Sequence, residues 1–88
     1  MVRRRVIVRG LVQGVGFRVS CARRSRAAGV GGWVRNAPDG SVEVVVEGDP
    51  AAVNQVIEWC RTGPPASRVD AVGISELGPT GERTFDIR

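Results

Sequence analysis

The amino-acid sequence predicts an α+β fold whose elements follow the order β-α-β-β-α-β, with a short extra strand at the C-terminus. Three observations support this order: a β-branched run leading through a glycine-rich turn into a helical segment, a strong hairpin pattern, and an amphipathic helix directly after the hairpin. The chain has 88 residues, which suffices for one domain, expected to span residues 1–88. With 42% apolar and 25% charged residues, its composition is that of an ordinary globular protein.

The first strand is expected over residues 3–12, where Val6 and Val8 share one face and charged side chains dominate the other. The first helix is expected over residues 17–28, and Gly29 follows at the position where a glycine commonly ends a helix. One face of this helix carries a stripe of small and apolar side chains: Phe17, Cys21, Ser25 and Ala28. Because most of these side chains are small, the helix is expected to pack close to the sheet.

A β-hairpin is expected from residues 32–36 and 41–47. The segment between them, Ala37-Pro38-Asp39-Gly40, has the order of a type I turn that is closed by a left-handed glycine. The valines of the second segment suit a strand.

Asp49 and Pro50 mark the start of a second helix, as N-cap and first helical residue. Its apolar residues recur at helical spacing: Val53, Val56, Ile57 and Cys60. Two further strands are expected over residues 68–76 and 85–87. The complete order is the split βαβ, or ferredoxin-like, arrangement, a sandwich of an antiparallel sheet with two helices on one face.

Charge is distributed unevenly along the chain. All 13 basic residues are arginine, and there is no histidine. Residues 1–38 contain nine arginines and no acid, whereas residues 39–88 contain four arginines and nine acids. This asymmetry favours an anionic partner, either a small phosphate compound or a nucleic acid. A solvated basic surface that steers anions is expected from the arginines at 3, 4, 5, 23, 24 and 26.

Several classes of site are excluded by composition. Without histidine there are no Ser-His triads, no histidine bases and no Cys/His metal clusters. Cys21 and Cys60 lack metal-ligand spacing and are expected to be buried small residues, with a disulfide between their helices left open. No apolar run reaches 18 residues, so no membrane span is expected and the expected location is cytoplasmic.

The segment from Gly10 to Arg18 carries the clearest functional signal. It joins the first strand to the first helix, contains three glycines and ends in an arginine. Glycines let successive backbone N–H groups converge, and the first turn of a helix adds unpaired donors and the positive end of its dipole. No Ser, Thr, Asp or Asn can cap this helix, so its amides lack an acceptor unless Gln13 serves. A bound phosphate would satisfy them, together with the Arg18 guanidinium.

With the loop, the hairpin and the element order established, the sequence resembles the acylphosphatase family over nearly its whole length. Five segments carry the resemblance, in matching order and spacing: Gly10–Arg18, Gly32–Asn36, Asp39–Glu43, Gly63–Pro65 and Phe85–Ile87. The resemblance implies hydrolysis of acyl phosphates without a metal or cofactor. Because the predicted site consists of amides and a guanidinium, inorganic phosphate or sulfate is expected to inhibit competitively. A chain of this size with a complete sheet and helices is expected to be a monomer.

The resemblance also implies roles for individual residues. Arg18 is expected to bind the substrate phosphate, and the loop is expected to cradle its oxygens; the candidate loop residues are Gln13, Gly14, Val15, Gly16 and Phe17. Asn36 is expected to hold the attacking water, a task that suits an amide, which both donates and accepts. From the residues alone, an asparagine directly before a turn is more commonly a turn former.

Two other readings were open. The fold is shared with RNA-recognition domains, so a nucleic-acid-binding module is the alternative, although the chain has only four aromatic residues to stack on bases. A phosphate-binding accessory domain of a larger carbamoyl-transfer protein is the other. We expect no nucleic-acid partner and a small-molecule acyl phosphate substrate.

Overall fold

The computed structural model describes residues 1–88, and it contains every predicted element with bounds that differ from the expected ones by at most one residue. Along the chain these are β1 (Val2–Leu11), α1 (Phe17–Ala28), β2 (Gly31–Asn36), β3 (Val42–Gly48), α2 (Pro50–Cys60), β4 (Arg68–Leu77) and β5 (Phe85–Ile87). The turn chemistry explains this agreement. Gly29 ends α1 with a φ of 75°, and the Asp49 carboxylate caps α2 by accepting from the Ala51 amide.

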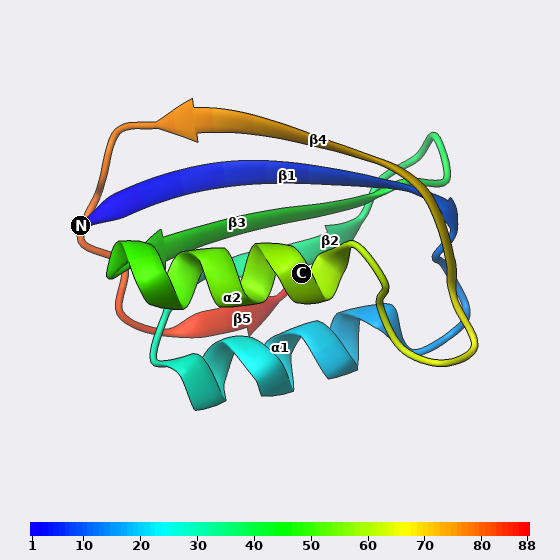
Figure 1. The fold of residues 1–88 in the computed structure, drawn as a ribbon, viewed down its shortest axis with the longest axis horizontal. Coiled ribbons are helices and arrows are strands. Elements are labelled where there is room, and N and C mark those ends of the chain that lie inside the picture. Colours follow the sequence, from blue (N-terminus) through cyan, green and yellow to red (C-terminus); the bar gives the residue numbers. More distant parts are fainter.

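The five strands form one sheet in the order β4-β1-β3-β2-β5 (Figure 1). Neighbours among β1 to β4 are antiparallel, as predicted, but β5 pairs with β2 in parallel, so the sheet is mixed. The path of the chain explains the difference. The segment after β4 runs along one end of the sheet, so β5 returns in the direction opposite to β4, which is the direction of β2.

Both helices cover the same face of the sheet (Figure 1), with α1 over β2 and β5 and α2 over β1 and β3. The core lies between the layers and is built largely from valine. Val6 and Val8 of β1 and Val44 and Val46 of β3 are fully buried and belong to the same apolar cluster as Val53 of α2. The predicted alternation of β1 and the apolar spacing of α2 are therefore both confirmed.

The two cysteines lie in this core. Cys21 of α1 and Cys60 of α2 are buried and free. A hydrogen bond with Cys21 and burial together raise the pKa of the Cys60 thiol well above its ordinary value. Both thiols therefore act as small core residues, as predicted.

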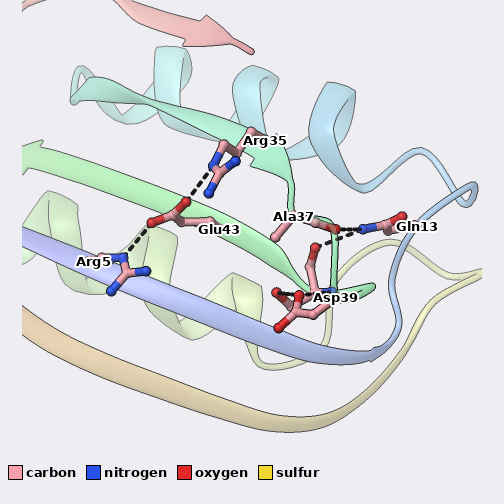
Figure 2. Close-up of polar contacts among 7 residues, drawn as sticks. Arg5, Gln13, Arg35, Ala37, Asp39 and Glu43 are labelled. Carbon is pink, nitrogen blue, oxygen red and sulfur yellow. Dashed lines mark hydrogen bonds and ion pairs between the residues drawn. The ribbon is translucent and has the colours of Figure 1, made fainter.

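The opposite face of the sheet carries paired charges. Arg3 lies 2.9 Å from Glu47, and only 11% of the Arg3 side chain is exposed. Glu43 accepts from Arg5 on one side and Arg35 on the other (Figure 2). Burial raises the pKa of Glu43, but these two guanidinium groups outweigh it and hold the pKa below its usual value. The prediction of a solvated basic surface is therefore wrong for these β1 arginines, because the strand register brings acids of β3 beside them.

The other arginines of that predicted surface differ among themselves. Arg4 pairs with an acid of β4 at 2.9 Å, and Arg26 donates two hydrogen bonds to a β5 carbonyl. Arg23 and Arg24 of α1 are exposed and take part in no ion pair. The prediction of a solvated basic surface therefore holds for these two and for Arg26, which is also exposed and pairs with no acid.

Candidate active site

Three connections meet at one end of the sheet (Figure 1): the β1–α1 loop (residues 12–16), the β2–β3 turn (residues 37–41) and the connection from α2 to β4. The last of these supports the start of α1. A Cβ atom on Gly63 would lie 2.8 Å from the ring of Phe17, so only glycine fits against that ring. The predicted loop and the predicted water-binding residue therefore lie at the same end of the molecule.

The β1–α1 loop has the backbone that its glycines predict. Gly14 and Gly16 adopt φ values of 74° and 79°, in the left-handed region that favours glycine. Val15 packs against the core, and Phe17 is buried with its ring 5.1 Å from that of Trp59. No atom lies within 4 Å of the positions that Cβ atoms would take on the two glycines. Side chains thus anchor the loop from below while its backbone faces open space.

The amides of this loop are unpaired within the chain. None of the twelve backbone hydrogen bonds outside the helices and strands is donated by residues 14–18. Gly16 is the N-cap of α1, and no side chain caps the helix. The positive end of the helix dipole therefore coincides with a group of free N–H donors, which is the arrangement that binds oxyanions.

Gln13 does not act as the missing helix cap. Its side-chain Nε2 donates to the carbonyl oxygens of Ala37 and Ser41 at 2.8 and 2.9 Å (Figure 2). The side chain of this predicted loop residue thus links the β1–α1 loop to the β2–β3 turn. Sequence reasoning missed the link, because it joins residues far apart in the chain.

Arg18 and Asn36 approach this end from different elements. Arg18 is the second residue of α1, and Asn36 is the last residue of β2, on the face that also carries the fully buried Val34. Both side chains are half-buried. Neither side chain hydrogen-bonds another residue of the chain. Their polar groups are free to bind a ligand.

The turn that follows Asn36 is held by an aspartate. Asp39 accepts from the hydroxyl of Ser41 at 2.6 Å and from its amide at 3.0 Å, and it pairs with Arg9 at 3.0 Å. The Ser41 donors and Arg9 hold the pKa of Asp39 well below its usual range. The carboxylate therefore stays ionised and keeps the turn closed. The sequence pattern predicts Asp39 only as a residue of the turn.

Comparison with known proteins identifies the family. A family model described as Acylphosphatase matches residues 4–87. An acylphosphatase of Anaeromyxobacter dehalogenans (strain 2CP-C) is 53% identical over 88 residues, covering 99% of this chain and 95% of that relative. The crystal structure of acylphosphatase from Bacillus subtilis matches with a TM-score of 0.96 at 36% identity, covering 100% of this chain and 99% of the other.

A similar domain also occurs within a larger protein. The crystal structure of full-length HypF in the phosphate- and nucleotide-bound form matches with a TM-score of 0.91 at 26% identity, covering 99% of this chain and 12% of that one.

These findings decide between the readings of the sequence. The curated relatives at 53% and 50% identity are named acylphosphatases, and nothing among them supports a nucleic-acid-binding module. Neither helix has the length and apolar character needed to cross a membrane. No cluster of three or more His, Cys, Asp or Glu side chains could hold a metal ion. The extent of the family match and the agreement of the folds show that this chain belongs to the acylphosphatase family.

Proposed function

We propose that this chain hydrolyses acyl phosphates to a carboxylate and inorganic phosphate. The observation that carries the proposal is the group of unpaired donors at one end of the sheet, formed by the amides of residues 14–18 and the Arg18 side chain. A dianionic phosphoryl group has three oxygens, which match such a set of donors. Membership of the acylphosphatase family supports the mixed anhydride as the substrate class.

The Arg18 guanidinium and the loop amides hold the phosphoryl group. A guanidinium presents two parallel N–H groups to two phosphate oxygens, while the amides take the remaining lone pairs. The donors are fixed before the substrate arrives, because the side chains of Val15 and Phe17 anchor the loop in the core. Preorganised donors of this kind stabilise the charge that develops during phosphoryl transfer.

Asn36 orients the attacking water. The water oxygen forms a bond to phosphorus while the bond from phosphorus to the acyl oxygen breaks, and its electron pair leaves with the carboxylate. The amide of Asn36 donates to the water or accepts from it, and so directs a lone pair toward phosphorus. A phosphate oxygen of the substrate takes the proton of the water, which removes the need for a histidine base.

No metal or cofactor enters this mechanism. The leaving carboxylate is weakly basic, so it departs without protonation by an acid. Arg18 and the amides need only position the phosphoryl group and neutralise its charge for the reaction to proceed. Inorganic phosphate and sulfate present the same oxygens as the substrate and are expected to compete with it. We also infer that the chain works as a monomer, because every proposed site residue belongs to one chain; light scattering of the purified protein tests this. A cytoplasmic location stays a prediction.

The test is a hydrolysis assay with benzoyl phosphate in the presence of EDTA. We expect full activity and competitive inhibition by phosphate and by sulfate. Absence of hydrolysis would refute the proposed function. If activity is lost in EDTA and restored by a divalent ion, the proposed reaction stands but the metal-free mechanism is refuted.

A further inference from the structure

We propose that Gln13 is a positioning residue that sets the place of Asn36 relative to the phosphate held by the β1–α1 loop. This inference rests on the proposed function and extends it to a residue whose side-chain NH₂ group is bonded to the β2–β3 turn. Its starting point is the pair of hydrogen bonds from Gln13 Nε2 to the Ala37 and Ser41 carbonyls, at 2.8 and 2.9 Å (Figure 2).

The sheet joins the two halves of the site only indirectly, through β3, whose Val42 pairs with Val8 of β1 and with Asn36 of β2. β1 leads into the loop and β2 ends at Asn36, but β3 lies between these two strands. No ladder hydrogen bonds therefore connect the end of β1 to the end of β2. The Gln13 side chain spans this gap, because it reaches from the loop after β1 to the turn that follows β2.

The turn does not depend on Gln13 for its own closure. The Ala37 carbonyl also accepts from the Gly40 amide at 3.1 Å, and the Ser41 carbonyl also accepts from the Ala37 amide at 2.8 Å. Asp39 adds two further bonds within the turn. Both carbonyls thus keep a donor when Gln13 is removed, so the two bonds from Gln13 serve to connect the turn to the loop.

The link acts close to Asn36. Ala37 is the next residue after Asn36, so fixing the Ala37 carbonyl fixes the end of β2 from which the Asn36 side chain extends. The second link between β1 and the turn is the ion pair of Arg9 with Asp39, whose side chains are 58% and 54% exposed. Exposed pairs of this kind hold geometry weakly. Of these two side-chain links, the half-buried Gln13 amide is therefore the stronger constraint on the position of Asn36 relative to the loop.

An amide is required at position 13. Both hydrogens of its NH₂ group are used, one on each carbonyl. Methionine has a similar length and shape but no donor, so Gln13→Met removes the link and little else. Glutamate in its ionised form would place oxygens against two carbonyl oxygens, so Gln13→Glu also removes the link while keeping a polar side chain.

The experiment compares Gln13→Met, Asn36→Ala and the double variant with the parent, using benzoyl phosphate for turnover and inorganic phosphate for affinity. The control is Gln55→Met, which makes the same chemical change on the exposed face of α2, where Gln55 makes no hydrogen bond within the chain. Circular dichroism and an unfolding midpoint are recorded for each protein. If Gln13→Met does not fold, Gln13→Glu takes its place with the same measurements.

We expect Gln13→Met to lower kcat by roughly 10- to 100-fold, because a misplacement of about 1 Å can cost that much. The inhibition constant for phosphate should stay within about threefold, because the loop donors remain. In the Asn36→Ala background the same substitution should change kcat by less than about threefold, because Gln13 acts through Asn36. Gln55→Met should match the parent.

Other outcomes overturn the inference. If phosphate affinity falls along with kcat, Gln13 shapes the phosphate site itself; if kcat is unchanged, the link is irrelevant to catalysis. If Asn36→Ala lowers kcat and Gln13→Met lowers it by the same factor in the parent and in the Asn36→Ala background, Gln13 does not act through Asn36. A parent protein that hydrolyses no acyl phosphate would instead refute the proposed function, so the two failures are distinguishable.

Discussion

Replacement of Arg18 by lysine tests the phosphate-binding role most directly. The guanidinium is half-buried and unpaired, so the substitution disrupts no ion pair of the folded chain. Lysine keeps the charge but presents a point donor in place of a planar fork. A hydrogen bond to a charged group contributes about 1.5 to 3 kcal/mol, so loss of one of two costs about that much. At about 1.4 kcal/mol for each factor of ten, we expect kcat/KM to fall roughly 100-fold.

The assay follows hydrolysis of benzoyl phosphate at several substrate concentrations and measures the inhibition constant for phosphate in parallel. Arg24→Lys is the matched control, because Arg24 lies on the same helix, is exposed and takes part in no ion pair. We expect Arg24→Lys to retain the parent's activity and Arg18→Lys to lose both turnover and phosphate affinity. A kcat/KM within twofold of the parent would show that Arg18 is not a phosphate ligand.

Two further predictions concern the scaffold. Gly32→Ala should lower the free energy of unfolding in urea by more than about 4 kcal/mol, because a Cβ atom at this φ of 130° would lie 1.8 Å from the Val45 carbonyl oxygen. The control is Gly73→Ala, whose Cβ atom would meet no atom within 4 Å. Equal losses of stability in the two variants would contradict the argument. The amide of Thr80, together with Arg3 and the amide of Gly81, lowers the pKa of Glu47 to about 2. The ionised carboxylate therefore stabilises the fold fully above its unfolded pKa of about 4.5, and this stability is lost as the pH falls through about 2. The melting temperature of Glu47→Gln should therefore fall less steeply than the parent's between pH 5 and pH 2, and parallel curves would show that Glu47 makes no such contribution.

Local chemistry made most of the fold predictable. The bounds of α1 follow from Gly16 and Gly29, whose left-handed conformations interrupt the chain at both ends of the helix. Likewise, Asp49 and Pro50 start α2 through contacts within a few residues. Signals of this kind need no knowledge of the tertiary structure, because the residues that determine the conformation are neighbours in the chain.

The parts that escaped prediction depend on contacts between segments that are far apart in the sequence. The arginines of β1 read as a free basic surface until the pairing of β1 with β3 is known, since Arg5 and Glu43 are far apart in sequence. The parallel pairing of β5 and the Gln13 link to the β2–β3 turn have the same origin. The residues alone predict Arg18 and the loop as a phosphate site, whereas only the resemblance predicts a role for Asn36, because an amide at a strand end carries no chemical signal of its own.

The strand order has a consequence for how the chain folds. β1 lies between β3 and β4 in the sheet. Arg4, near the start of β1, lies opposite Glu76 of β4, which is near the other end of the chain. β4 (Arg68–Leu77) therefore does not exist until about the last quarter of the chain is synthesised. Contacts between segments so distant in sequence carry a loop-closure entropy that local contacts do not, so they slow folding. Until β4 is synthesised and paired, Arg4 lacks its acidic partner Glu76. The unpaired charge on β1 then opposes premature association of its apolar valines.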